Sequence, residues 1–92
     1  MATAAARPWY VYILRCADGS LYTGATTDLG RRHGRHEAGT ASRYTRSRRP
    51  TRLVYWEAHP DRGAALRREA AIKGLPRSEK LALIPADRRN AA

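Results

Sequence analysis

The chain has 92 residues and one cysteine, and its 18 Lys and Arg outnumber its 8 Asp and Glu, for a formal net charge of +10 at pH 7. This length allows one small domain with its active site at the surface, and the lone Cys16 excludes an internal disulfide and a multi-thiolate zinc site, which fits a reducing cytoplasm. No apolar run approaches a signal core or a membrane span, so we expect no membrane contact, while the basic excess favours nucleic acid as the partner.

The first predicted element is a β-hairpin. Val11 to Cys16 is a largely apolar run with β-branched and aromatic residues, an Asp-Gly turn follows, and Leu21 to Ala25 continues as the second strand. The length of the loop decides where the tyrosines of these strands point, because side chains alternate between the two faces of a strand.

Two loop lengths fit the hairpin. A two-residue loop turns Tyr22 to the face opposite Tyr12. A three-residue loop with Gly19 in the left-handed conformation pairs Tyr22 with Leu14 instead, and places both tyrosines on one face. We predict the three-residue loop, because a site shared by the two phenols requires it.

A helix is predicted from Leu29 to Ala38, with Asp28 as its N-cap and Gly39 just after its end. Arg32 and His36 lie one turn apart on the stripe that begins with the apolar Leu29. Both side chains are therefore candidates to face the hairpin, although either could be an ordinary surface residue.

The segment from Thr40 to Thr51 has no periodicity and predicts a loop. Together with the preceding helix it forms a window in which Glu37 is the only acid, and 16 of the 18 basic residues of the chain are Arg, which favours bidentate phosphate contacts. A solvated charged loop is the alternative. The predicted nucleic-acid contacts are Arg31, Arg35, Arg43, Tyr44, Arg46, Arg48 and Arg49.

The rest of the chain adds one strand and two helices. Arg52 to Ala58 alternates as a third strand, a helix begins at Pro60-Asp61 and runs to about Lys73, and a short helix spans Arg77 to Ile84. We therefore predict a single α/β domain, a small three-stranded antiparallel sheet flanked by helices, over residues 8–85, with flexible ends at residues 1–7 and 86–92.

Glu69 lies in the middle of the apolar face of the longer helix, between Ala65 and Ile72. A carboxylate is seldom buried without a partner. The partner is either Arg62 or Lys73 on the same helix, or a divalent cation at the edge of the sheet, since hard cations are commonly held by one or two carboxylates with water and substrate phosphate.

Two short motifs resemble a known family. Tyr10-Val11-Tyr12 is followed ten residues later by Tyr22-Thr23-Gly24, and this pair is similar to the signature of the GIY-YIG nuclease superfamily, with Tyr10, Val11 and Thr23 in place of Gly, Ile and the second Ile. The likeness runs from Trp9 to about Ile84. The stretch from Tyr44 to Pro50 is similar to the small stand-alone bacterial proteins of this superfamily, akin to the catalytic module of endonucleases that cut branched DNA.

The resemblance implies a metal-dependent endonuclease, related to DNA repair enzymes, that acts on DNA more than on RNA. By this resemblance Tyr12 or Tyr22 helps to deprotonate the attacking water, Arg32 holds the scissile phosphate, and His36 stands where a His or Tyr follows that arginine. Glu69 would anchor one Mg²⁺ or Mn²⁺ ion. Some members carry a Lys just after the Gly of the second motif, where this chain has Ala25, and many carry a late Asn near the site, whereas the only Asn here is Asn90 in the tail. Water activation must therefore rely on the tyrosines, His36 or the metal.

Other functions stay open. A catalytically weak or inactive nucleic-acid-binding module would use the Arg-rich surface and stack Tyr44 on bases without metal-dependent turnover. A ribosomal or chromatin-type structural protein would need the charge but not Glu69. The sequence leaves open which tyrosine is the base, whether the substrate is single-stranded, duplex or branched, and whether a partner protein supplies specificity.

Overall fold

The computed structural model describes residues 7–89, which form three strands and five helices. The elements are β1 (Trp9–Arg15), β2 (Leu21–Thr26), α1 (Leu29–Glu37), α2 (Arg43–Arg46), β3 (Arg52–His59), α3 (Arg62–Lys73), α4 (Arg77–Leu83) and α5 (Ala86–Arg89). The strands are arranged in the order β2-β1-β3 and both pairs are antiparallel. This confirms the predicted fold class.

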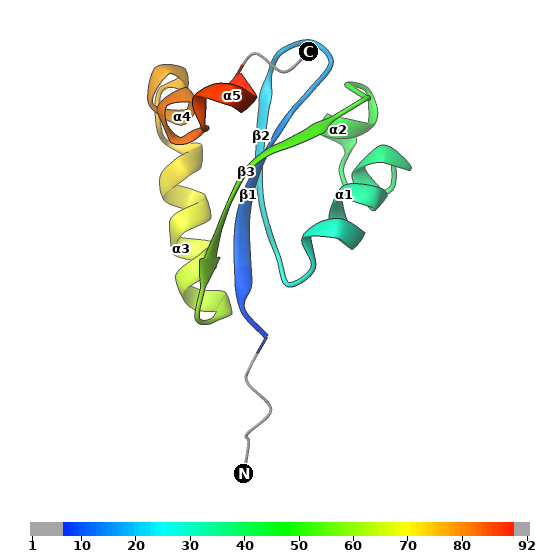
Figure 1. Cartoon of the computed structure of the whole chain (residues 1–92). Helices are drawn as coiled ribbons and strands as arrows, with labels where there is room; N and C mark the ends of the chain where they lie inside the picture. The colour runs from blue at the N-terminus through cyan, green and yellow to red at the C-terminus, as the bar shows by residue number, and fades with distance from the viewer. Residues whose placement is uncertain (1–6, 90–92) are drawn as a thin grey trace.

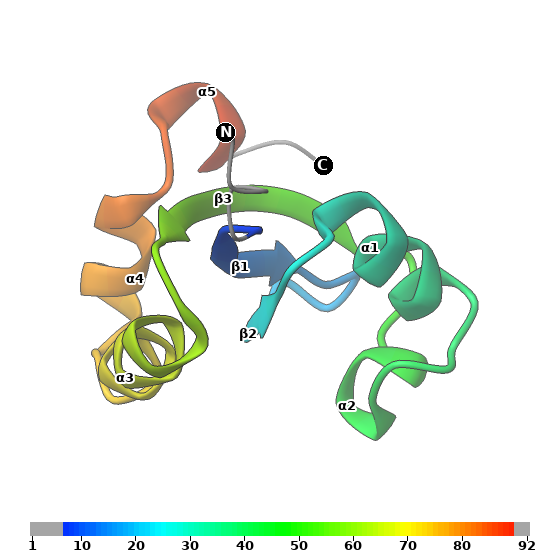
Figure 2. The same cartoon turned by 90° about the horizontal axis from the view of Figure 1, so that it is seen from below.

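Helices lie on both sides of the sheet. Figure 2, a view along the strands, shows α3 and α4 on one side and α1 and α2 on the other, and Figure 1 shows the same division from the front. The hydrophobic core lies between the sheet and α3, because the alternate side chains of β1 on that face are apolar. The buried core cluster consists of Val11, Ile13, Val54, Ala65, Ile72 and Ile84.

The hairpin has the predicted three-residue loop. The amide of Cys16 donates to the carbonyl of Ser20 and the amide of Gly19 donates to the carbonyl of Cys16, each at 2.9 Å. Gly19 has a φ of 84°, the left-handed conformation that this loop needs. Leu14 therefore pairs with Tyr22, as predicted.

The predicted loop between α1 and β3 contains a helix, α2, which corrects the prediction. The Ser42 side chain accepts a hydrogen bond from the Thr45 amide, so Ser42 is the N-cap of this single turn. Four residues are too few to show helical periodicity, and only the capping residue signalled the turn. The neighbouring helix α1 begins and ends within one residue of the prediction, with Gly39 following it at a φ of 79°.

Within the end that was predicted to be flexible, residues 86–89 form the short helix α5. The Arg88 guanidinium lies 4.5 Å from the ring centre of Trp56, and Arg89 Nε donates to the Ile84 carbonyl at 2.7 Å. These contacts with β3 and α4 order the turn, and neither is visible as a sequence period. The expected flexibility of residues 1–6 and 90–92 lies outside the described residues.

Among residues 7–89, no helix is both long and apolar enough to span a bilayer.

Candidate functional site

Two tyrosines from neighbouring strands lie side by side on the sheet face that α1 and α2 flank. Tyr12 of β1 pairs with Gly24 of β2, Tyr22 lies two residues before Gly24, and the two rings are 6.5 Å apart. Tyr12 is only 2% exposed. A Cβ on Gly24 would lie 2.4 Å from the Tyr12 hydroxyl, so the ring lies directly over this glycine. The glycine of the second motif thus gives the first tyrosine its position.

His36 closes the site from α1. Its side chain is 1% exposed, and Nε2 lies 2.8 Å from the Tyr12 hydroxyl. Its ring is edge-on to Tyr22 at 5.1 Å between centres. Asp28 caps the start of the helix by accepting from the Arg31 amide. The helix and the hairpin therefore bring together the tyrosines and the histidine that the sequence analysis placed on facing surfaces.

The second nitrogen of His36 contacts a residue that the sequence analysis did not single out. Thr45 is fully buried, and its Oγ1 lies 2.7 Å from His36 Nδ1 and 2.9 Å from the Ser42 hydroxyl. Tyr12, His36, Thr45 and Ser42 form one continuous chain of hydrogen bonds. The spacing of Ser42 and Thr45, an N-cap residue and the third residue after it, was the one signal in the sequence that could have found this pair.

Burial keeps Tyr12 and His36, the two titratable side chains of this series of hydrogen bonds, neutral. It raises the pKa of Tyr12 above that of a free phenol; Tyr22 adds to the rise, and the Arg32 charge and hydrogen bond oppose it. Burial, with the Arg32 charge, lowers the pKa of His36 from 6.5 to about 4. An uncharged phenol and an uncharged imidazole therefore face each other at neutral pH.

The partners of Thr45 favour one direction for this series of hydrogen bonds. The Thr45 hydroxyl donates to the Ser42 carbonyl at 3.5 Å, so its oxygen accepts from the Nδ1–H of His36. Nε2 of the neutral His36 then carries no proton and accepts from the Tyr12 hydroxyl. In this tautomer each buried group of the chain has a partner, in keeping with the absence of unsatisfied buried side-chain atoms over the described residues.

Glu69 lies on α3, and its charge is the smallest of the named effects that raise the pKa of Tyr12. Its carboxylate is paired with Lys73, with 3.0 Å between Oε2 and Nζ. The Glu69 side chain is 18% exposed and the Lys73 side chain 55% exposed. Lys73, one of the two structural partners that the sequence left open, is thus in contact with Glu69, and a cation this exposed holds it only weakly.

The residues fit a hard divalent cation better than zinc. Within residues 7–89, no three His, Cys, Asp or Glu side chains converge on one metal position. Zinc sites need three or four such ligands, whereas Mg²⁺ binds through one or two carboxylates and completes its shell with water and substrate phosphate. Glu69 is the carboxylate that could hold such an ion.

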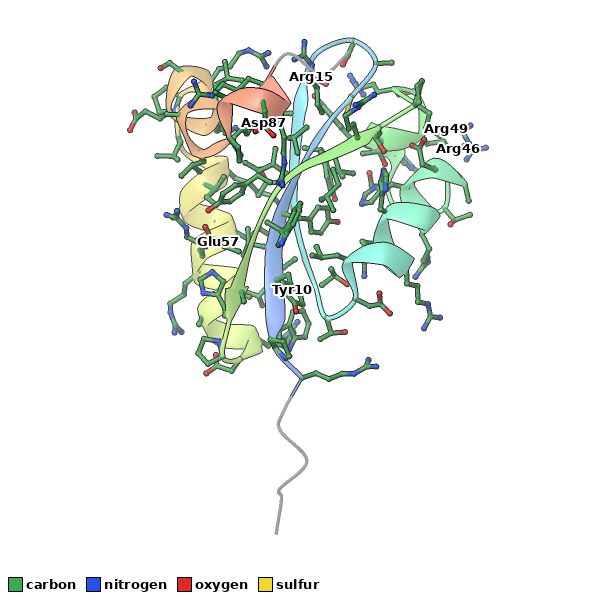
Figure 3. All side chains as sticks on the ribbon, in the orientation of Figure 1. Tyr10, Arg15, Arg46, Arg49, Glu57 and Asp87 are labelled. Carbon is green, nitrogen blue, oxygen red and sulfur yellow. The ribbon has the colours of Figure 1, made fainter. Side chains whose placement is uncertain are left out.

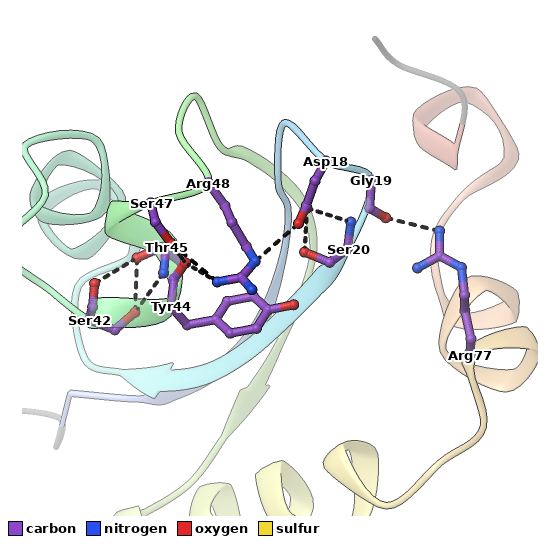
Figure 4. A network of polar contacts seen from close by, with 9 residues as sticks. All are labelled: Asp18, Gly19, Ser20, Ser42, Tyr44, Thr45, Ser47, Arg48 and Arg77. Carbon is purple, nitrogen blue, oxygen red and sulfur yellow. Dashed lines mark hydrogen bonds and ion pairs between the residues drawn. The ribbon is translucent and has the colours of Figure 1, made fainter.

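An aromatic stack fastens α2 to the hairpin. Tyr44 stacks on Tyr22 with 5.9 Å between ring centres, and the Arg48 guanidinium lies 3.9 Å from the centre of the Tyr44 ring. Arg48 Nε also pairs with Asp18 Oδ2 in the turn at 3.0 Å, as Figure 4 shows. Tyr44 and Arg48, both expected to contact nucleic acid, therefore have partners within the protein, although the Tyr44 residue remains 38% exposed.

The other predicted nucleic-acid contacts fall into two groups. Arg49 is exposed but has partners within the protein, since it donates to the carbonyls of Arg46 and Glu37, and Figure 3 shows Arg46 and Arg49 near each other beside α1 and α2. The second group points outward: Arg43 and Arg46 are exposed on α2, and Arg31 and Arg35 are exposed on α1.

Comparison with known proteins gives one consistent result. A model of the GIY-YIG catalytic domain matches residues 8–82. A UPF0213 protein of Streptococcus sanguinis is 49% identical over 82 residues, covering 89% of this chain and 94% of that protein, and a UPF0213 protein of Cupriavidus pinatubonensis is 46% identical over 76 residues, covering 83% and 84%. The solution NMR structure of a UPF0213 protein from Bacillus halodurans is 49% identical, with a TM-score of 0.54 over 83% of this chain and 81% of that one.

Proposed function

Because the chain belongs to the GIY-YIG catalytic domain family, we propose that it is a metal-dependent endonuclease that hydrolyses phosphodiester bonds in nucleic acid, with DNA as the preferred substrate. The observation that carries the proposal is the buried 2.8 Å contact between Tyr12 and His36, with Arg32 beside it. A structural tyrosine of a sheet needs neither partner, whereas a proton acceptor needs both a route for its proton and a nearby cation.

Tyr12 is the better placed of the two tyrosines to accept the proton of the attacking water. Its hydroxyl gives its own proton to Nε2 of the neutral His36 as it takes one from the water, so no free phenolate has to form. The resulting imidazolium keeps its Nδ1–H bonded to Thr45 Oγ1. The low pKa of His36 makes it a weak base, so the relay requires an acidified water.

Arg32 and Glu69 have complementary roles. Arg32, half-buried next to Tyr12, binds a non-bridging oxygen of the scissile phosphate and offsets the charge that grows in the transition state. Glu69 holds the Mg²⁺ or Mn²⁺ ion, which when bound polarises the phosphoryl oxygen and lowers the pKa of water. The Lys73 side chain must leave the carboxylate for this, and its exposure allows that.

One observation favours a second candidate, a nucleic-acid-binding module without turnover. Glu69 already has a cationic partner in Lys73, at 3.0 Å. A protein that kept this ion pair would bind DNA through its arginines and leave the phosphodiester intact.

A nicking assay separates the two functions. Labelled duplex, flap and single-stranded DNA are incubated with Mg²⁺, Mn²⁺ or a chelator, and the wild type is compared with Glu69→Gln, Tyr12→Phe and, as a control, Glu79→Gln in the first turn of α4. We expect metal-dependent cleavage by the wild type and the control, and at least a hundredfold loss in the other two, the scale of removing a general base. Binding without cleavage in every condition would support the binding module.

Thermal melting tests the metal assignment separately. Glu69→Gln should melt close to the wild type without metal, because it leaves Lys73 in solvent rather than buried and unpaired. Mg²⁺ should raise the melting temperature of the wild type but not of Glu69→Gln. Equal shifts in both proteins, or full cleavage by Glu69→Gln, would remove this residue from the metal site.

A further inference from the structure

Four arginines surround a pocket at the start of α1. The pocket has a volume of about 280 Å³. Three of the arginines come from α1 and one precedes β1, so a helix and the chain before the first strand meet around it. Its lining residues are Arg7, Thr26, Thr27, Asp28, Arg31, Arg32 and Arg35.

The positive charge of this pocket is not balanced by the protein. Over residues 7–89, none of its four arginines forms an ion pair with an acidic side chain, whereas Arg48 and Arg68 elsewhere pair with Asp18 and Glu57. Asp28 is the only acid in the lining, and its Oδ1 accepts from the Arg31 amide as the helix cap. Four guanidinium groups against one carboxylate repel one another unless an anion lies between them.

The pocket adjoins the candidate active site through Arg32. Arg32 lines the pocket and lies on α1 one helical turn before His36, which contacts the Tyr12 hydroxyl at 2.8 Å. Its charge also opposes the rise in the pKa of Tyr12 that burial causes. Arg31 and Arg35 are one helical turn apart, so their side chains extend the positive surface along α1 away from Tyr12. A strand whose scissile phosphate lies at Arg32 has its neighbouring phosphate beside this surface.

We propose that the pocket binds the phosphate group next to the scissile one on the same nucleic-acid strand, with Arg31 and Arg35 as the main contacts and Arg7 closing the far side. The inference rests on the proposed function, because Arg32 defines which phosphate is the scissile one. Its consequence is that the strand is held at two successive phosphates, which fixes the position of the bond to be cut without reading any base.

The test is a binding scan that does not depend on cleavage. A short labelled flap duplex, whose branch point gives a sequence-blind protein one fixed register, is prepared in versions that each carry one uncharged methylphosphonate, at every position in turn. Affinity for the wild type is measured in a chelator. We expect a methylphosphonate to lower the affinity about tenfold at each of two successive positions, the scale of one charge-assisted contact. Mapping the cut in Mg²⁺ should place the scissile bond at one of these two positions.

Two double variants test whether the pocket binds the phosphate next to the scissile one. Arg31→Ala with Arg35→Ala should bind the unmodified duplex more weakly. In this variant a methylphosphonate at the phosphate next to the scissile one should no longer lower the affinity, while one at the scissile phosphate still should. Arg43→Ala with Arg46→Ala removes the same charge from exposed residues of α2 and should keep both penalties. Arg31→Lys with Arg35→Lys keeps the charge and guards against a folding artefact, which circular dichroism also checks.

The outcomes separate this inference from the proposed function. If the Arg31 and Arg35 variant keeps both penalties, the pocket assignment is wrong while cleavage by the wild type can stand. If the penalties behave as expected but no condition yields cleavage, the pocket is supported and the nuclease proposal fails. If the wild type binds none of the duplexes, both are overturned.

Discussion

Gly24 shows how one missing side chain places a catalytic candidate. The Tyr12 ring occupies the space where a Cβ on Gly24 would be, and its hydroxyl thereby reaches His36. The glycine of the second motif is therefore required by the packing of the tyrosine in the first motif, because a larger residue at position 24 would take the space of the Tyr12 ring.

We predict that Gly24→Ala lowers both the stability of the fold and cleavage. The added methyl would lie 2.4 Å from the Tyr12 hydroxyl, so the ring must shift away from His36, and overpacking of this kind costs about 1–3 kcal/mol. Cleavage should fall at least tenfold. Gly34→Ala is the control, because a Cβ there meets open space and helix propensity favours alanine. Similar activity in both variants would show that the Tyr12 position is not critical.

The pKa of His36 makes the stability of the fold dependent on pH. Its folded pKa of about 4 lies below the unfolded value of 6.5, so the unfolded chain binds the proton more tightly. The contribution of the neutral imidazole is fully present above pH 6.5 and is lost as the pH falls toward 4, about 3 kcal/mol in all.

We therefore expect the melting temperature of the wild type to fall between pH 7 and pH 4.5 more steeply than that of His36→Gln. The low-pKa carboxylates Asp18, Glu37 and Glu57 are present in both proteins, so their effect cancels in the comparison. Calorimetry at closely spaced pH values provides the measurement. Parallel curves for the two proteins would mean that His36 is not held neutral by burial.

At the scale of elements, α2 supports the site from outside. Its N-terminal turn presents Thr45 to His36, its Tyr44 ring stacks on Tyr22, and the Arg48 just after it pairs with Asp18 of the hairpin turn. The Ala17 amide adds a backbone hydrogen bond of 2.9 Å to the Arg48 carbonyl. This one-turn helix therefore buttresses both the histidine and the second tyrosine.

We predict that removing the Thr45 hydroxyl weakens both the fold and the chemistry. Thr45→Val keeps the shape but leaves His36 Nδ1 buried without a partner, which costs about 1–3 kcal/mol. It also frees the imidazole to change tautomer, so the maximal cleavage rate should fall while substrate affinity is unchanged. Thr45→Ser should restore both. If Thr45→Val loses stability but keeps the maximal rate, the threonine is only structural.

The hairpin and α2 mark where sequence reasoning succeeds and where it ends. The register of Tyr12 and Tyr22 followed from turn chemistry, because Gly19 allows the left-handed conformation that a three-residue loop requires. Local rules also located α1 through its Asp28 cap and the glycine after it. The contact between Thr45 and His36 joins residues nine apart on different helices, and no local period encodes it.

The same limit applies to the charges. The sequence showed an Arg-rich window but not which of its arginines have partners within the protein. Arg48 pairs with Asp18, and Arg49 donates to the carbonyls of Glu37 in α1 and Arg46 in α2. Likewise, the position of Glu69 on an apolar face predicted that it needs a partner, and only the structure shows Lys73 in contact.

At the scale of the whole molecule, the net charge of +10 is concentrated where the site lies. On the α1 and α2 side, Glu37 accepts from the Thr51 amide and hydroxyl, at 2.8 and 2.7 Å, and among residues 7–89 it forms no ion pair with the outward arginines. On the α3 side, Glu57 accepts from Tyr55, His59 and Arg68, and these hydrogen bonds outweigh the effect of burial and lower its pKa. Both carboxylates thus stabilise the fold, and the arginines on the α1 and α2 side form a basic surface that suits a polyanion.

This distribution predicts which arginines control the salt dependence of DNA binding. Each phosphate contact that is lost reduces the slope of log affinity against log salt by about 1. Arg43→Ala with Arg46→Ala removes exposed charges of α2, whereas changing Arg48 or Arg49 would also break contacts that hold α2 in place. We expect the double variant to reduce the slope by about 2 and to have the melting temperature of the wild type.

The control is Arg62→Ala with Arg67→Ala, on exposed positions of α3 across the sheet, which should leave the slope unchanged. Anisotropy titrations of a labelled duplex over a series of salt concentrations measure both slopes, and an equal decrease in the two variants would mean that the basic surface of α1 and α2 is not the binding face.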